Sequence, residues 1–323
     1  MVEITVKVSG DHWVNVYEVA SQLQHAKVNE HIVLDLGSEG ASLRALGIED
    51  LLLKHCAETN TPHNLITISN WPNTLEQNPF NRGYNPRISH FVWMTRNYWL
   101  DAPILQRHDY KFGYFMGRRT PSRMSMMYQV YHAFPGEFLL SAMKTQVSDP
   151  WVTVPDGMYL EKISDWIGEE AIAWWQTKPI DSLDNHSVNE QYQVDKNTNK
   201  DLLTVYGKFD IELVAETYTL GETFFPTEKT LRPTMAGKPI MVYGPANYLA
   251  NFKKLGFQTY ESLWDESYDQ LQGLARWNAI KTVIQQLVEL PRSQFIFLID
   301  QAQGIAQANR RHLETLIDRY QPQ

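Results

Sequence analysis

Strand-like and helix-like runs alternate along this chain, and this alternation constrains its fold more than any other feature. Short runs rich in β-branched and aromatic residues occupy residues 3–8, 31–36, 64–69 and 89–94, and a helical pattern at residues 45–58 separates two of them. Strands joined through helices are parallel, because only a crossover connection returns the chain to the same end of the sheet. The sequence therefore predicts an α/β fold with a parallel sheet flanked by helices.

A second series of the same kind begins after residues 101–103. It predicts further strands at residues 111–116, 210–215 and 239–243, and helices at residues 122–132, 161–176 and 227–236. Two long helical patterns follow between residues 267 and 320, broken at Leu290-Pro291. Residues 180–201 are rich in Asp, Asn, Ser, Lys and Gln, which indicates an exposed loop.

Two α/β series in 323 residues predict two domains. We expect an N-terminal domain at residues 1–105, a second domain at 106–290 and a C-terminal helix at 291–323 that packs back across an interdomain cleft. Ligands bind at the carboxyl ends of the strands in open parallel sheets, so both sheets would present loops to that cleft.

The charge balance limits the partners of the chain. It carries 29 Lys and Arg against 37 Asp and Glu, a net charge of −8, which disfavours nucleic acid and anionic membranes as partners. The single Cys56 cannot form an internal disulfide, and no run of about 18 apolar residues indicates a membrane span. We expect a cytoplasmic protein without a membrane span.

The most informative segment reads strand, loop, helix and strand between residues 210 and 244. Thr227 follows Pro226 and is a candidate N-cap, so Glu228 and Lys229 fall in the first helical turn. Free backbone N–H groups and the positive end of the helix dipole attract phosphate there. Lys229 would add a point charge, and Glu228 could accept hydrogen bonds from two ribose hydroxyls. The alternative is an ordinary capped helix whose Glu228 only compensates the dipole.

This segment resembles the donor-binding segment of fucosyltransferase-like glycosyltransferases of the GT-B class, in a branch with bacterial and viral members. The family pattern is Phe-Glu-Asn, a short aromatic loop, Thr-Glu-Lys, a helix, and a Pro-led strand that ends in Gly. The resemblance places Glu216 and Thr217 at the Glu-Asn pair, and Thr227, Glu228 and Lys229 at the Thr-Glu-Lys motif that contacts ribose and diphosphate.

Residues 111–123 extend the similarity, which covers about residues 111–269. They read as a strand, a Gly-containing loop and a helix capped by Ser122. The resemblance implies that Arg123 pairs with the donor diphosphate; taken alone, an arginine in a first helical turn is more often a surface residue. It also implies a GT-B fold of two Rossmann-like domains, with the nucleotide sugar bound by the second.

An inverting transfer needs a base beside the attacking hydroxyl, and the first domain offers carboxylates after a predicted strand. We nominate Glu39 as the catalytic base and Asp35 as the second choice. Both could instead have a structural role in the loop, and His12, His63 and His90 are alternatives.

The expected activity is metal-independent transfer of a sugar, with inversion, from a nucleoside diphosphate to the hydroxyl of a saccharide or other acceptor. One alternative is a glycosyltransferase acting on hydroxymethylated bases of phage DNA, which the acidic charge disfavours. Another is a non-catalytic module that binds a nucleotide or a glycan. Walker, Gly-x-Gly-x-x-Gly and Gly-x-Ser-x-Gly motifs are missing, which removes the main support for NTPase, dehydrogenase and hydrolase functions.

We predict that transfer continues in excess EDTA. The sequence contains no Asp-x-Asp metal motif, and a helix terminus with Lys229 and Arg123 can balance the diphosphate. Product formation with and without EDTA checks this. Complete loss that Mn²⁺ or Mg²⁺ restores would contradict it and would implicate Asp265, Glu266 and Asp269. The alternative for this acidic segment is that Ser267 and Asp269 cap the start of a helix.

Overall fold

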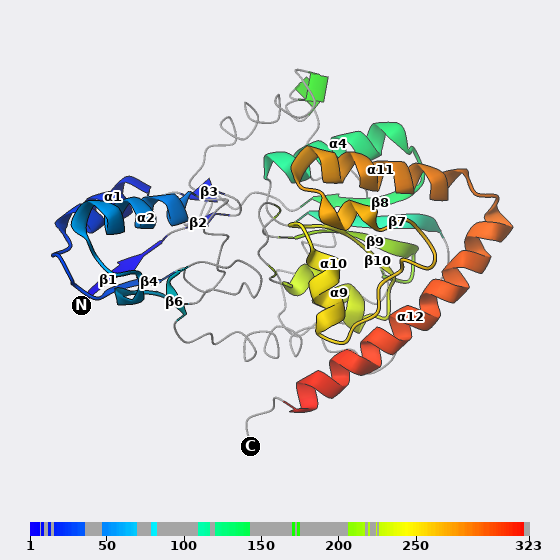
Figure 1. Cartoon of the computed structure of the whole chain (residues 1–323). Helices are drawn as coiled ribbons and strands as arrows, with labels where there is room; N and C mark the ends of the chain where they lie inside the picture. Colours follow the sequence, from blue (N-terminus) through cyan, green and yellow to red (C-terminus); the bar gives the residue numbers. More distant parts are fainter. Residues whose placement is uncertain are drawn as a thin grey trace, which may run out of the picture.

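The computed structural model describes residues 1–6, 8–9, 12–13, 16–35, 47–69, 79–82, 109–116, 120–142, 170–171, 173–174, 206–216, 219, 224 and 226–319. Within these residues the chain forms two parallel four-stranded sheets, each with helices packed beside it (Figure 1). The α/β fold predicted from the sequence is confirmed. Each sheet has its own hydrophobic core.

The first sheet has the strand order β1-β4-β5-β6, and its paired strands are parallel. Its strands are β1 (Val2–Thr5), β4 (Ile32–Asp35), β5 (Ile66–Ser69) and β6 (Asn81–Arg82). The chain advances in one direction across these strands, so right-handed crossovers place the connecting helices on the same face. These helices, α1 (Val16–His25) and α2 (Ile48–Thr59), lie side by side in Figure 1.

Apolar residues of both helices meet the strands in a small core. Ile4, Ile32 and Leu34 are completely buried in the sheet, and Val19 and Leu52 are buried from the helices. Three short elements are also described in this part of the chain: strands β2 (Val8–Ser9) and β3 (His12–Trp13), which pair antiparallel, and the 3₁₀ helix η1 (His63–Leu65).

The second sheet has the order β10-β9-β7-β8 and is also parallel. Its strands are β7 (Tyr110–Met116), β8 (Phe138–Ala142), β9 (Phe209–Ala215) and β10 (Ile240–Tyr243). The chain first moves outward from β7 to β8, then returns to the other side of β7 and continues through β9 to β10. The strand order therefore reverses between β7 and β9, which makes this pair the topological switch point of the sheet.

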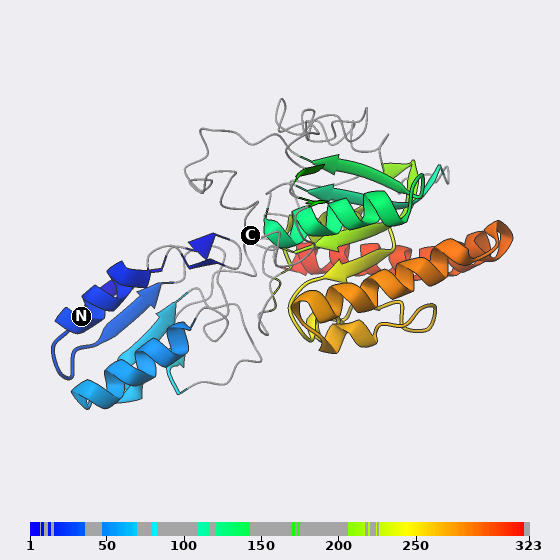
Figure 2. The ribbon, with the colours of Figure 1, turned by 90° about the horizontal axis from the view of Figure 1, so that it is seen from above.

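The reversal places helices on both faces of the second sheet. Helices α4 (Pro121–Ala133) and α11 (Gly273–Glu289) cover one face (Figure 2), and α9 (Glu228–Met235) and α12 (Arg292–Arg319) cover the other (Figure 1). The indole nitrogen of Trp277 on α11 donates to Gln129 on α4 at 3.0 Å. The short elements α10 (Tyr248–Lys254) and η3 (Ser267–Gln270) follow β10.

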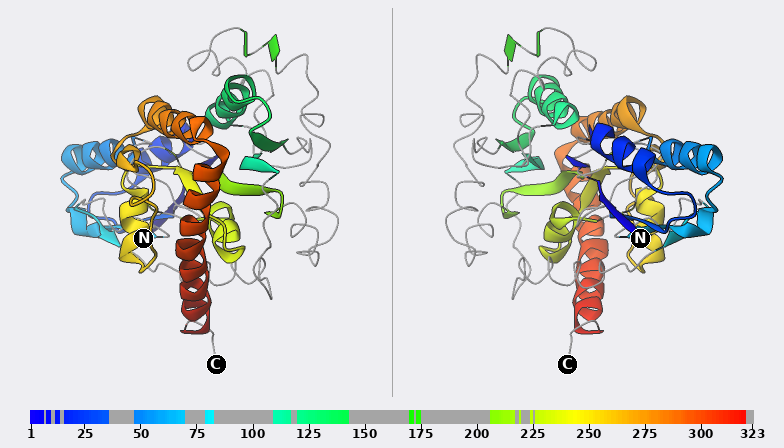
Figure 3. Two further views of the ribbon diagram at one scale, coloured as in Figure 1. Left: turned by 90° about the vertical axis from the view of Figure 1, so that its right-hand side faces the viewer. Right: turned by 90° about the vertical axis from the view of Figure 1, so that its left-hand side faces the viewer.

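Helix α12 runs along the outside of α9 (Figure 3). We call each sheet with its packed helices a unit, the first unit and the second unit in chain order. Asn309 joins α12 to the rest of the second unit: its side chain accepts a hydrogen bond from Gln258 N and donates one to Gln258 O, both at 2.8 Å. The helix has 28 residues and carries charged side chains. In the part of the chain that the structure describes, no helix is long and apolar enough to cross a membrane.

Most of the predicted elements are present within a few residues. The predicted break at Leu290-Pro291 is also confirmed, because α11 ends at Glu289 and α12 begins at Arg292. Among the described elements, helices α1 and α10 and strand β8 were not predicted, nor were the two-residue strands β3 and β6. The strand predicted at 89–94, most of the helix predicted at 161–176 and the loop at 180–201 lie outside the described residues.

We predict that Gly113→Ala destabilises the second unit. Gly113 lies in the middle of β7, and a Cβ atom there would stand 2.8 Å from the buried Phe209 ring. Displacing that ring should lower the free energy of unfolding by about 1–3 kcal/mol, measured in urea. Gly304→Ala is the control: Gly304 is exposed on α12, a Cβ atom there would meet no atom within 4 Å, and the change should stabilise the helix by roughly 0.5–1 kcal/mol. Equal stability of Gly113→Ala and wild type would contradict the packing.

Candidate functional site

The switch point brings the carboxyl ends of β7 and β9 together at one edge of the second sheet. Helix α4 begins just after β7, and Glu216 directly follows β9. An Nη atom of Arg123 on α4 donates to the main-chain carbonyl of Glu216 at 2.6 Å, so one hydrogen bond joins the two sides. Ligands of open α/β sheets bind at this position.

Glu216 lies at the centre of this edge. Its residue surface is 1% exposed, and its carboxylate accepts four hydrogen bonds from the protein. They come from Thr227 N at 3.1 Å, Thr227 Oγ1 at 2.6 Å, Thr230 Oγ1 at 2.6 Å and Tyr248 OH at 2.9 Å. The carboxylate therefore joins the end of β9 to the first turns of α9 and α10.

Thr227 is the N-cap of α9, as predicted. Its backbone is extended, and its Oγ1 accepts a hydrogen bond from the backbone N–H of Lys229 at 3.3 Å. The hydroxyl proton goes to Glu216 in the opposite direction. The start of α9 is thus held against the switch point by a chain of hydrogen bonds from the helix to the hydroxyl to the carboxylate.

Glu228 and Lys229 form an ion pair in the first turn. Lys229 Nζ lies 2.5 Å from Glu228 Oε1 and 3.4 Å from Thr227 Oγ1. Partial burial opposes the ionisation of Glu228, but the charge and hydrogen bond of Lys229, the Glu228 backbone N–H and the Arg232 charge outweigh it and lower the pKa of Glu228 to about 2. The Glu228 side chain is 31% exposed and that of Lys229 17%, so a ligand at this edge can reach both.

The other end of α9 is also fixed to the sheet by charged groups. Arg232 donates to Glu212 on β9 at 2.7 Å and to the Tyr206 hydroxyl. Burial raises the pKa of Glu212, although the nearby Arg232 opposes this. Burial also lowers the pKa of Lys238 to about 8, against the opposing charges of Asp210 and Glu212. We did not predict this cluster from the sequence, although two acidic residues at alternate positions of an apolar strand were a visible signal.

Five of the six predicted donor-binding residues lie together at this edge: Arg123, Glu216, Thr227, Glu228 and Lys229. They differ in exposure, because Arg123 and Glu216 are buried against the protein whereas Glu228 and Lys229 are partly exposed. The sixth, Thr217, lies outside the described residues.

The predicted bases belong to the first unit. Asp35 ends β4 and pairs in register with Thr5 and Ser69, so it lies at the carboxyl edge of the first sheet, as expected. Glu39 and His90 lie outside the described residues. The His63 ring packs edge-on against the Phe80 ring, with 5.8 Å between the ring centroids, and His12 is in β3.

The acidic segment at residues 265–269 binds backbone amides. Asp265 accepts from Ser267 N at 2.8 Å, and Asp269 accepts from Leu249 N at 2.9 Å and Ala250 N at 3.0 Å, which caps α10. Asp269 is therefore a capping residue, but of α10 and not of the helix start at residue 267 that the sequence suggests. Within the described ranges, no group of three or more His, Cys, Asp or Glu side chains could hold a metal ion.

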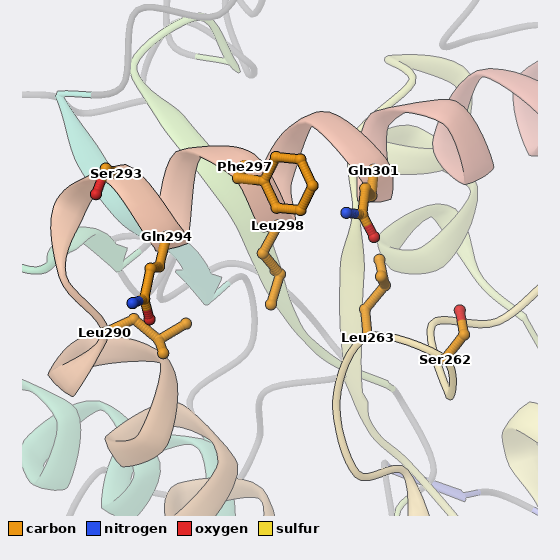
Figure 4. Close-up of a pocket in the computed structure, with 8 residues that line it drawn as sticks. All are labelled: Ser262, Leu263, Leu290, Ser293, Gln294, Phe297, Leu298 and Gln301. Carbon is orange, nitrogen blue, oxygen red and sulfur yellow. The ribbon is translucent and has the colours of Figure 1, made fainter.

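An open groove of about 490 Å³ lies where α11 meets α12 (Figure 4). Its lining residues are neutral: Ser262, Leu263, Leu290, Ser293, Gln294, Phe297, Leu298 and Gln301. Lys111, at the start of β7, donates to Val288 O near the end of α11, so this junction lies at the amino edge of the sheet, opposite the switch point. A groove without charge there does not fit a phosphate ligand.

Comparison of the chain with protein-family models, with curated proteins and with solved structures finds no match.

We predict that Glu266 makes the fold less stable as pH rises. Burial raises its pKa to about 7, against the opposing effects of Thr259, Tyr260 N and Lys253, and nearby Asp269 raises it further. The native state therefore holds this proton more tightly than the unfolded chain does. The stabilisation is complete below pH 4.5 and is lost as pH rises through 7.

Urea unfolding at pH 5 and pH 8 measures this effect. Glu266→Gln should lose less stability over this range than wild type, by about 1.4 kcal/mol for each unit of pKa shift expressed between the two pH values. Glu261→Gln is the matched control, because it removes the same charge from an exposed side chain of the same segment. Parallel pH profiles for wild type and Glu266→Gln would contradict the assignment.

Proposed function

We propose that this chain is a glycosyltransferase of the GT-B class that uses a nucleoside-diphosphate sugar. The observation that carries the proposal is the position of Lys229 in the Thr227-capped first turn of α9, beside the switch point of the second sheet. A topological switch point, a helix N-terminus and a partly exposed cation are three features that favour a phosphate ligand, and here they coincide.

The diphosphate would take the place of Glu228 as the partner of Lys229. In the structure the ammonium group is engaged by the adjacent carboxylate. A phosphate oxygen offers a charge-assisted bond of the same kind and also gains the helix dipole. The released Glu228 carboxylate could then accept from the ribose hydroxyls. Arg123 adds a positive charge behind this edge, where it is held by the Glu216 carbonyl.

The transfer step would need a base from the first unit. A carboxylate accepts the proton of the acceptor hydroxyl while the hydroxyl oxygen attacks the anomeric carbon of the donor sugar. The bond from that carbon to the diphosphate breaks on the opposite face, and the nucleoside diphosphate leaves with the electron pair. We assign the base to Glu39, or to Asp35 at the end of β4, and the acceptor hydroxyl to a saccharide. The reaction as proposed requires no metal ion.

We predict that nucleoside diphosphates bind to the wild-type chain and that Lys229→Ala weakens the binding about ten- to hundredfold. This is the expected loss for one charge-assisted hydrogen bond to phosphate. Isothermal calorimetry with ADP, CDP, GDP and UDP measures the affinities and also identifies the nucleobase of the donor.

Lys253→Ala is the matched control for this experiment. Lys253 lies at the last turn of α10, pairs with Glu261 and is 39% exposed, so its removal changes the net charge equally without touching α9. Its nucleotide affinity should stay within about twofold of wild type. If none of the four nucleotides binds, or if the two variants bind alike, the proposed function is wrong.

A further inference from the structure

We propose that Glu216 is a positioning residue for the nucleotide site: it does not touch the ligand, and it acts by orienting the Thr227 hydroxyl that caps α9. This inference rests on the proposed function for its ligand. It assigns Glu216 a different role from the direct donor contact that the sequence suggests.

The burial of Glu216 argues against direct contact. With 1% of the residue exposed and four protein donors on its carboxylate, it presents no surface to a bound nucleotide. Its main chain is equally engaged, since Glu216 N donates to Tyr243 O and its carbonyl accepts from Arg123. A buried carboxylate with this set of partners is a junction between secondary-structure elements.

The direction of the hydrogen bonds explains how Glu216 acts. Thr227 donates its only hydroxyl proton to the carboxylate, so the Oγ1 lone pairs face Lys229, whose N and Nζ lie at 3.3 and 3.4 Å. Both of those groups are donors. The cap therefore depends on an acceptor behind the hydroxyl, which a carboxylate always supplies.

Glu216→Gln tests this dependence at nearly constant volume. The carboxamide can keep one oxygen for Thr230, Tyr248 and Thr227 N, but its NH₂ then faces the Thr227 hydroxyl. The hydroxyl would have donors on every side, so one bond of the cap must break. The loss of a cap at this turn should weaken nucleoside-diphosphate binding about fivefold.

A double-mutant cycle separates positioning from direct contact. Calorimetry with ADP, CDP, GDP and UDP would compare wild type, Glu216→Gln, Thr227→Val and the double variant. If Glu216 acts through Thr227, the double variant binds no more weakly than Thr227→Val alone. Multiplying losses, about 25-fold for two fivefold effects, would overturn the proposal.

Asp269→Asn is the matched control, because Asp269 is also a buried carboxylate that caps a helix, α10, without contacting α9. Its nucleotide affinity should stay within about twofold of wild type. A loss equal to that of Glu216→Gln would indicate general loosening and would overturn the specific role of Glu216.

Amide hydrogen exchange tests the inference without a ligand. Glu216→Gln should speed exchange in the first turn of α9, at the Lys229 amide, and Asp269→Asn should not. If no nucleotide binds wild type, the proposed function fails, and the exchange result alone decides the role of Glu216. Unchanged exchange in Glu216→Gln would overturn the positioning role.

Discussion

The arrangement of the carboxyl edge of the second sheet depends on the hydrogen bonds that the buried carboxylate of Glu216 accepts. A charged group in an apolar interior is costly unless it is fully hydrogen-bonded, so this carboxylate requires donors in defined places. Thr227, Thr230 and Tyr248 meet that requirement, and they lie at the start of α9 and of α10. The first turns of both helices are consequently held against the end of β9, where the strand order reverses.

The buried charge of Arg276 fixes the chain that follows β10 in the same way. Arg276 is completely buried and donates to the carbonyls of Val242, Pro245 and Asp269, and to the Asp269 carboxylate. Asp269 in turn caps α10. Polar side chains therefore satisfy the backbone groups that the ends of β10 and η3 leave unpaired. These bonds hold η3 and the start of α10 against the end of β10.

Elements were predicted from the sequence where one periodicity dominated. Strand β9 and helices α11 and α12 have long apolar patterns with a clear period, and they were found. Helix α1 was missed although Val16, Val19, Ala20 and Leu23 have helical spacing. The run at residues 138–142 is short and apolar, which leaves helix and strand equally compatible, and pairing with β7 made it β8. Helix α10 has only seven residues, and a carboxylate 20 residues away caps it.

The sequence by itself determined the α/β class, the N-cap at Thr227 and the first-turn location of Glu228 and Lys229, because these features depend on local spacing. Only the tertiary structure decided that β8 and β9 lie on opposite sides of β7, so that a switch point forms beside that turn. It also decided that Glu216 is buried and points at Thr227, since the two residues are 11 positions apart and meet only when α9 packs against β9. A local sequence pattern does not determine which charged side chains the folded chain shields from water. Tertiary packing buries Glu216 and leaves Lys229 partly exposed.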